Sequence, residues 1–189
     1  MRLIVVLVLA LSTSVAVLAQ QRFDFKVRED MFAGMDGDTA AFDRAMKLID
    51  DTLATDPNHA EALVWRGDGR LFLAGQAFQR GAFADGQALA AQATADMDRA
   101  VALAPDNIAV RVPRAAGLLP FARSMRPFNR PEADRLTRTA IGDFEFVWPP
   151  ARLGGASWAS MAAANCWALW PTAGWRWARP PRPMPISTA

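Results

Sequence analysis

The amino-acid sequence predicts an all-α protein in which antiparallel helix pairs stack as a short α-α superhelix, followed by an irregular C-terminal tail. Two observations predict this fold. Apolar residues recur at helical spacing through much of the chain, and a helix-ending corner with a proline occurs twice, at Pro57 and Pro105. A helix with one apolar stripe has to bury that stripe against another element.

The segment from Ala41 to Gly67 contains the clearest helical pattern. Its first helix places apolar residues on one face and charged residues on the other. Asp38 or Thr39 is the predicted N-cap, because a short polar side chain accepts a hydrogen bond from the free amides of the first turn. Pro57 ends this helix, since it lacks an N–H and restricts the residue before it. The predicted apolar face consists of Phe42, Ala45, Met46, Ile49 and Leu53.

A second helix is predicted to fold back after the corner, and the whole pattern then returns. The corner prolines lie 48 residues apart (105 − 57). Repetition of apolar positions at a fixed offset is typical of repeat proteins. The buried face of the second helix is predicted to hold Ala60, Val64, Gly67, Leu71 and Ala74. The 48-residue shift places Ala45 on Ala93, Ile49 on Met97, and Leu53 on Val101.

These residues resemble the tetratricopeptide repeat family. The resemblance covers roughly residues 38–110 and is carried by small Ala45, bulky Ile49, the corner DPNHAEA and Gly67. It implies stacked helix pairs with a concave face that binds peptides or proteins. The spacing departs from the family pattern of about 34 residues. The segment from Gly75 to Gly86, with three glycines, is interpreted as a helix end plus an inserted loop.

Helices are also expected on both sides of this region. Residues 22–34 predict a short leading helix with Phe25 and Phe32 as core candidates. After Pro105 a helical face continues, and Pro120 is expected to end or kink it. Phe121 to Arg130 is interpreted as a basic loop. Pro131 is favoured in the first turn of a last helix, whose apolar face is predicted to hold Ala133, Leu136, Ala140, Phe144 and Val147.

Residues 1–19 are typical of a secretory signal peptide. Arg2 precedes a nearly continuous apolar run, and small residues precede a predicted cleavage site after Ala19. The alternative is a retained membrane anchor, but the run is short for a span of about 20 residues. The sequence thus predicts a periplasmic or secreted protein with a helical domain at 20–147.

The tail at 148–189 differs abruptly in composition. It holds six of the seven tryptophans, and no acidic residue follows Glu145. A shifted reading frame offers an explanation. When each third codon base is read with the next two bases, Asn165 to Ala168 must encode Leu-Leu-Gly, whichever synonymous codons are used. Our hypothesis is that the tail is an out-of-frame product that replaces a final helix pair, leaving Leu136, Ala140 and Phe144 uncovered.

Composition argues against several classes of chemistry. His59 is the only histidine, so no histidine pair can bind a metal, and a corner role is the simpler interpretation. Cys166 has no second cysteine to form a disulfide with and lacks a recognisable base nearby. All 19 acidic residues lie before Phe146, so the basic balance comes from the chain ends. We therefore expect no catalytic residue, no cofactor, no metal and no nucleic-acid partner.

The function predicted from these features is a scaffold that binds a protein or peptide. Trp65, Arg66 and Arg70 are the candidate partner-binding residues, because they project from the helix after the first corner. One alternative is a small-ligand carrier or enzyme with a site between helix pairs, built from Arg111, Arg114 and Asp68. Another is a membrane-surface protein acting through its tryptophan-rich tail, without stable membrane insertion after signal cleavage.

Overall fold

The computed structural model describes residues 22–149. Within this range the chain is all-helical and has no strand, which confirms the predicted fold class. The predicted signal peptide and residues 150–189 of the tail lie outside the described residues. The helices are α2 (Asp24–Met35), α3 (Thr39–Thr55), α4 (Ala60–Gln79), α5 (Phe83–Leu103), α6 (Ile108–Met125) and α7 (Arg130–Val147).

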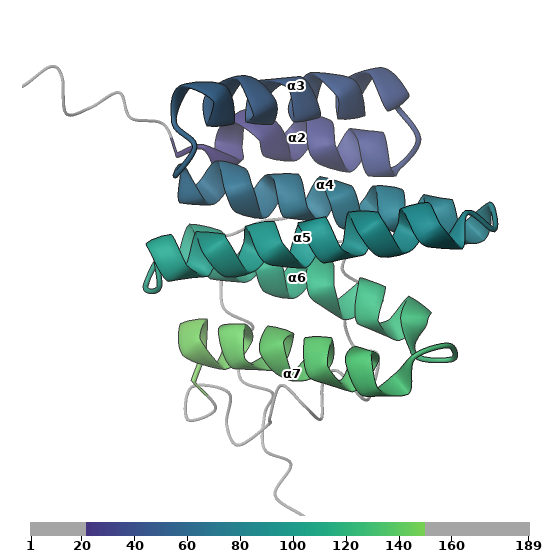
Figure 1. Cartoon of the computed structure of the whole chain (residues 1–189). Helices are drawn as coiled ribbons and strands as arrows, with labels where there is room; N and C mark the ends of the chain where they lie inside the picture. Colours follow the sequence, from purple (N-terminus) through teal and green to yellow (C-terminus); the bar gives the residue numbers. More distant parts are fainter. Residues whose placement is uncertain (1–21, 150–189) are drawn as a thin grey trace, which may run out of the picture.

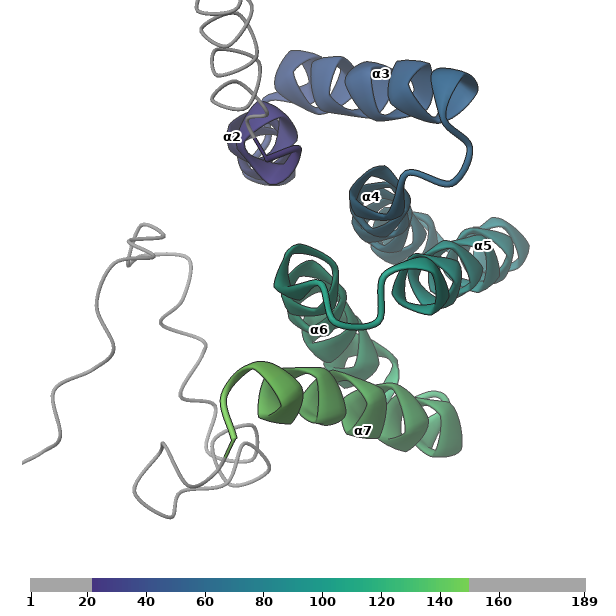
Figure 2. The same ribbon diagram turned by 90° about the vertical axis from the view of Figure 1, so that its left-hand side faces the viewer.

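The helices alternate between two layers (Figures 1 and 2). We call α2, α4 and α6 the inner layer, and α3, α5 and α7 the outer layer. Each inner helix packs against the next inner helix, so that α4 contacts both α2 and α6. The outer helices pack on inner helices and make no extensive contact with one another. The result is a curved stack with α4 at its centre.

The helix pairing differs from the sequence prediction. Ala41 to Gly67 was expected to form one hairpin, but α3 packs more extensively on α2 than on α4, and α4 packs most extensively on α5. The hairpins are therefore α2–α3, α4–α5 and α6–α7, and the proline corners connect one hairpin to the next. Helical spacing identifies a buried face but not the neighbour that buries it.

The corner recurs a third time at Pro149. Each outer helix ends two residues before a proline, and the residue between them is not helical, because proline disfavours the helical region for its predecessor. The backbone angles φ and ψ are −129° and 91° at Asp56, −141° and 70° at Ala104, and −128° and 85° at Trp148. Thus the restriction that proline places on the residue before it ends α3, α5 and α7.

Capping side chains begin the helices that follow the first two corners. His59 Nδ1 accepts from the Ala62 amide at 3.1 Å, and Asn107 Oδ1 accepts from the Ala109 amide at 2.9 Å. The structure therefore gives His59 the corner role that the sequence favours. Asp38 is the N-cap of α3, with its carboxylate 3.0 Å from the Ala41 amide.

Small residues let α4 approach its neighbours closely. A Cβ on Gly67 would lie 2.6 Å from Met97 Cγ and 2.9 Å from the Ala93 carbonyl oxygen, both on α5. A Cβ on Gly69 would lie 2.5 Å from Met46 Sδ on α3. These glycines are therefore needed for packing, although glycine weakens a helix.

Two interruptions predicted from glycine and proline are much smaller than expected. Gly75 lies inside α4, and the turn to α5 needs only Arg80 to Ala82, with Gly81 at a φ of 78°. Pro120 does not end α6, which continues to Met125. The helix persists because the residues around Pro120 bury apolar side chains, while Pro120 itself is exposed. These side chains belong to Leu118, Leu119, Phe121 and Ala122.

The structure also corrects two predictions about the core, one at each end of the described region. Phe25 is 48% exposed, and the buried apolar residues of α2 are instead Val27 and Met31. Phe32 is partly buried and packs on the core, as expected. At the other end, the apolar face of α7 was expected to lose its cover, but its packing on α6 accompanies burial of the three residues concerned. These are Leu136, Ala140 and Phe144.

We predict opposite effects for two glycine substitutions in α4. Gly67→Ala should lower the free energy of unfolding by about 1–3 kcal/mol, because the new methyl group meets fixed backbone of α5. Gly75→Ala is the matched control and should raise it by about 0.5–1 kcal/mol, since its Cβ has no neighbour within 4 Å. Urea unfolding followed by circular dichroism measures both; equal effects would contradict close packing at Gly67.

Candidate functional site

Arginine and aspartate side chains join the two helices of the α4–α5 hairpin. Arg66 Nε and Nη2 each donate to the Asp96 carboxylate at 2.8 Å, and Arg70 donates to the same carboxylate. Asp96 is 9% exposed. A bidentate arginine–carboxylate pair fixes orientation as well as supplying energy. This cluster therefore sets how α4 and α5 face each other.

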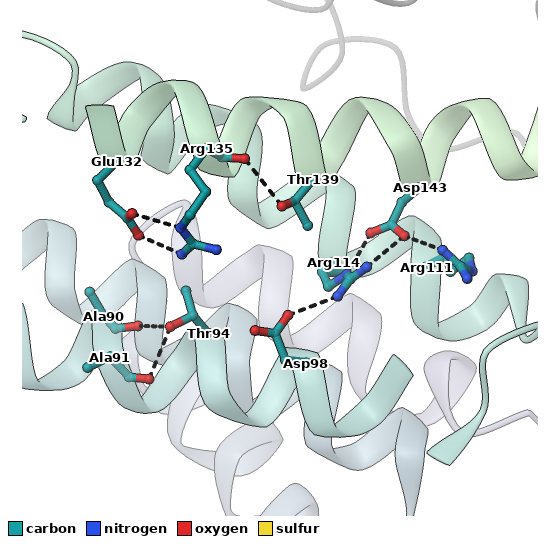
Figure 3. Close-up of polar contacts among 10 residues, drawn as sticks. All are labelled: Ala90, Ala91, Thr94, Asp98, Arg111, Arg114, Glu132, Arg135, Thr139 and Asp143. Atoms are coloured by element: carbon teal, nitrogen blue, oxygen red, sulfur yellow. Dashed lines mark hydrogen bonds and ion pairs between the residues drawn. The ribbon is translucent and has the colours of Figure 1, made fainter. Parts of the chain in front are cut away.

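A second cluster joins α6 and α7 in the same manner (Figure 3). Arg114 donates to Asp143 through Nε at 2.6 Å and through Nη2 at 2.8 Å. Arg111 Nη1 donates to Asp143 at 2.7 Å, and Arg114 Nη1 donates to Asp98 of α5 at 3.0 Å. Asp143 is only 1% exposed. Arg114 thus connects three helices through two carboxylates.

The two clusters are related by the internal repeat. Arg66 and Arg114 each lie nine residues after a corner proline (66 − 57 and 114 − 105), and each binds an aspartate on the following outer helix. The sequence analysis compared only apolar positions, so it missed this relation. The signal was present, because the 48-residue shift places Arg66 on Arg114. Because Arg66 and Arg114 both bind an aspartate across their hairpin, we infer that their role is structural.

The structure separates Trp65 from the other two candidate partner-binding residues, Arg66 and Arg70. Trp65 is 3% exposed and packs edge-on against the Phe32 ring of α2, with ring centroids 6.0 Å apart. Arg66 and Arg70 project towards α5, and their side chains are 22% and 25% exposed. Consecutive positions on a helix face different directions, so these residues do not form one surface.

The residues proposed for a ligand site between helix pairs are also divided. Arg111 and Arg114 converge on Asp143. Asp68 instead lies at Gly117, where an added Cβ would be 2.2 Å from the Asp68 carboxylate oxygen. No hydrogen bond or ion pair among residues 22–149 joins Asp68 to the two arginines. Arg111 and Arg114 are therefore already bound to Asp143 in the α6–α7 interface.

The pKa of the Asp68 carboxyl is shifted from its usual value. It is partly exposed and makes no hydrogen bond or ion pair with the residues that the structure describes. Burial raises its pKa from 3.8 to about 7, because a carboxylate loses hydration there without gaining a cation. An acid of this kind weakens the folded state at neutral pH. Such residues are often found at functional sites.

Two further unpartnered groups lie on the same face of α4. Glu61 Oε2 and Trp65 Nε1 are buried and have no hydrogen-bond partner. Residues at positions i, i+4 and i+7 of a helix share one face. We call these three residues, Glu61, Trp65 and Asp68, the polar stripe of α4. It is the strongest candidate site because buried polar atoms are normally bonded.

Other classes of site have no support in the described region. Residues 22–149 contain no group of three metal-ligating side chains that are close enough to hold an ion. No helix in this range is long and apolar enough to cross a membrane.

No family model, curated protein or solved structure matches the chain. The resemblance to tetratricopeptide repeats therefore depends on the residues and the helix arrangement alone.

We expect Asp143→Asn to destabilise the fold strongly. The substitution removes the charge that neutralises buried Arg114, and breaking a buried ion pair costs about 3–5 kcal/mol. Asp51→Asn is the control, because its ion pair with Lys47 is exposed and should contribute under about 1 kcal/mol. Thermal and urea unfolding measure the difference. Similar losses in both variants would show that the Arg114 cluster does not hold the hairpin together.

The Asp68 carboxyl predicts a specific pH dependence. Its folded-state pKa is above the ordinary 3.8, so the native state binds the proton more tightly. The stability that this group contributes should fall as pH rises from about 4 to 7 and then level off. Asp68→Asn cannot ionise and should become more stable than wild type over that window, by roughly 2–4 kcal/mol.

The measurement is urea unfolding of both proteins from pH 4 to pH 8. The difference between the two curves isolates Asp68 because all other titrating groups are shared. A constant difference across this range would show that Asp68 has an ordinary acidity.

Proposed function

We propose that this chain is an exported, tetratricopeptide-like helical scaffold that binds a protein or peptide partner and catalyses no reaction. One observation carries the proposal: the unpartnered polar groups of α4 lie together on one face, while the charged side chains between hairpin helices bind each other. The inner layer is therefore the side on which a partner has polar groups to satisfy.

The helix arrangement supports the resemblance to tetratricopeptide repeats. Similar hairpins follow one another, the connecting corner recurs, and an arginine–aspartate pair repeats with it. Stacked repeats of this kind create extended curved surfaces that suit peptides and proteins. A small-ligand carrier or enzyme is the second candidate, and the raised pKa of Asp68 is the observation in its favour.

Export follows from the signal-like residues 1–19, which we propose are removed after Ala19. The partner is thus proposed to be met in the periplasm or outside the cell. The membrane-surface alternative depends on residues 150–189, which are outside the described region.

We further propose that a frame error has replaced the last helix pair. The alternation of layers supports this proposal, because a repeat array of this kind would be expected to continue with an inner helix after the corner formed by Trp148 and Pro149. The printed residues beyond this corner lack helical periodicity, whereas the shifted frame contains the forced Leu-Leu-Gly. The two observations come from different properties of the chain, and both support a change of frame before Asn165.

Site-specific photo-crosslinking tests the scaffold function. A benzoylphenylalanine replaces Phe25, which is 48% exposed on inner helix α2, or Leu48, which is 38% exposed on outer helix α3. In cells that make the full chain, the Phe25 position should yield a discrete crosslinked partner and the Leu48 position should not. Equal labelling from both positions, or no labelling from either, would contradict a partner on the inner layer.

Resequencing the codons for Phe146 to Pro150 tests the frame error. We expect one additional base, which restores an amphipathic helix pair after the corner. An unchanged sequence, together with a stable exported product that carries the tryptophan-rich tail by mass spectrometry, would refute the proposed frame error.

A further inference from the structure

The turn between α6 and α7 presents a large apolar side chain to solvent. Phe128 is 86% exposed, the highest value among the large apolar residues of the described region. The amides of Phe128 and Asn129 both donate to the Met125 carbonyl at 2.9 Å. Asn129 Oδ1 in turn accepts from the Glu132 amide at 3.2 Å, which begins α7. The backbone of the turn is therefore fully bonded, and the ring stands outside it.

Arginine residues lie two positions before and two positions after this ring. Arg126 Nη2 and Arg130 Nε are 3.2 Å and 3.8 Å from the two carboxylate oxygens of Asp134. The two arginine side chains stay 50% and 75% exposed, and one carboxylate cannot neutralise both of them. Arg123 in the last turn of α6 adds a third cation. We call Arg123, Arg126, Phe128 and Arg130 the arginine tip of the α6–α7 hairpin.

The charge around this tip is opposite to that of the rest of the domain. Residues 121–138 contain five arginines and two acidic residues, a net charge of +3. Residues 20–145 contain 16 basic and 19 acidic residues, so the remainder holds 11 and 17 (16 − 5 and 19 − 2), a net charge of −6. A separation of charge of this kind orients a protein so that its basic end meets an anionic surface.

A second exposed aromatic ring lies at the same end of the stack. The three hairpin turns are all at one end, and the proline corners are at the other (Figure 1). Phe83 is the first residue of α5 after the α4–α5 turn and is 61% exposed. Its ring centroid is 6.3 Å from that of Phe78, which is 6.4 Å from that of Phe121 on α6. Aromatic contacts therefore join the two hairpins close to their turns, and a flat partner can meet both.

We propose that the arginine tip binds the surface of an anionic lipid bilayer, with the Phe128 ring among the lipid chains near the headgroups and the arginines on the lipid phosphates. Guanidinium groups match phosphate oxygens through paired N–H donors. Exposed aromatic rings combined with arginine are typical of segments that lie in the interface of a membrane. The α2–α3 turn holds Asp36 and Asp38, so the contact is confined to the other two turns.

This inference goes beyond the scaffold function, because it concerns where the domain is held and not what its inner layer binds. Each arginine close to an anionic membrane surface should contribute about fivefold to the affinity. Raising the ionic strength from about 0.1 M to about 1 M shortens the screening length from about 10 Å to about 3 Å. Binding through the tip should therefore weaken strongly over this range of salt.

Co-sedimentation of the full chain with lipid vesicles tests the inference. One set of vesicles contains equal parts of phosphatidylglycerol and phosphatidylcholine, and the other contains phosphatidylcholine alone. We expect binding to the anionic vesicles to be tighter by about tenfold or more. Phe128→Ser, and the double variant with Arg126→Gln and Arg130→Gln, should each weaken this binding by about fivefold or more.

Matched controls are available at the opposite end of the stack. Phe25→Ser removes a ring that is 48% exposed near the start of α2 and that also has two arginines over it. Arg99→Gln removes one exposed cation near the end of α5. Both controls should leave vesicle binding unchanged. Circular dichroism of every variant excludes unfolding as the cause of a loss.

Each other outcome refutes the inference. Equal binding to the two kinds of vesicle, or binding to neither, would contradict recognition of an anionic bilayer. Anionic binding that the tip variants leave unchanged would place the membrane contact elsewhere in the chain, for example in residues 148–189. Capture of polyglutamate but not of vesicles would assign the arginine tip to an acidic protein. The crosslinking from the Phe25 position decides the scaffold function separately.

Discussion

The close approach of neighbouring helices to the middle of α4 is the constraint on which the rest of the structure depends. Three consecutive residues face three directions: Gly67 towards α5, Asp68 towards α6, and Gly69 towards α3. Because the two glycines lack side chains, the thioethers of Met97 and Met46 fill the space beside the α4 backbone. Flexible methionine suits such irregular gaps. The curvature of the stack follows from how near these helices lie.

Charge is distributed in two contrasting ways around this centre. Asp96 and Asp143 each receive two arginines, so the carboxylates that lie deepest between hairpin helices are well compensated. Asp68 is on the opposite side of α4 and receives no arginine from the residues that the structure describes. Burial of this carboxyl without a cation costs stability at neutral pH.

The proline corner links the described domain to the unusual tail. The non-helical backbone at Asp56 and Ala104 directs the chain from an outer helix into the next inner helix, and Trp148 has similar backbone angles. The corner at Pro149 thus resembles the two corners that precede inner helices. A cationic, tryptophan-rich sequence without helical periodicity is a poor continuation of such a stack. This mismatch in composition and helical periodicity is the reason for the frame-error hypothesis.

The sequence by itself determined which segments are helical, where proline corners end α3 and α5, and which faces are apolar, since these depend on local spacing and local backbone restriction. It misjudged the burial of Phe25 and the start of the loop at Phe121, because exposure and helix persistence depend on neighbours distant in the chain. Only the tertiary structure decided that α4 pairs with α5 and not with α3. It also decided that Arg66 and Arg114 form similar ion pairs within their hairpins, and that Asp68 has no ion-pair partner among the described residues. These outcomes depend on which side chains meet across helices, and helical periodicity carries no information about that choice.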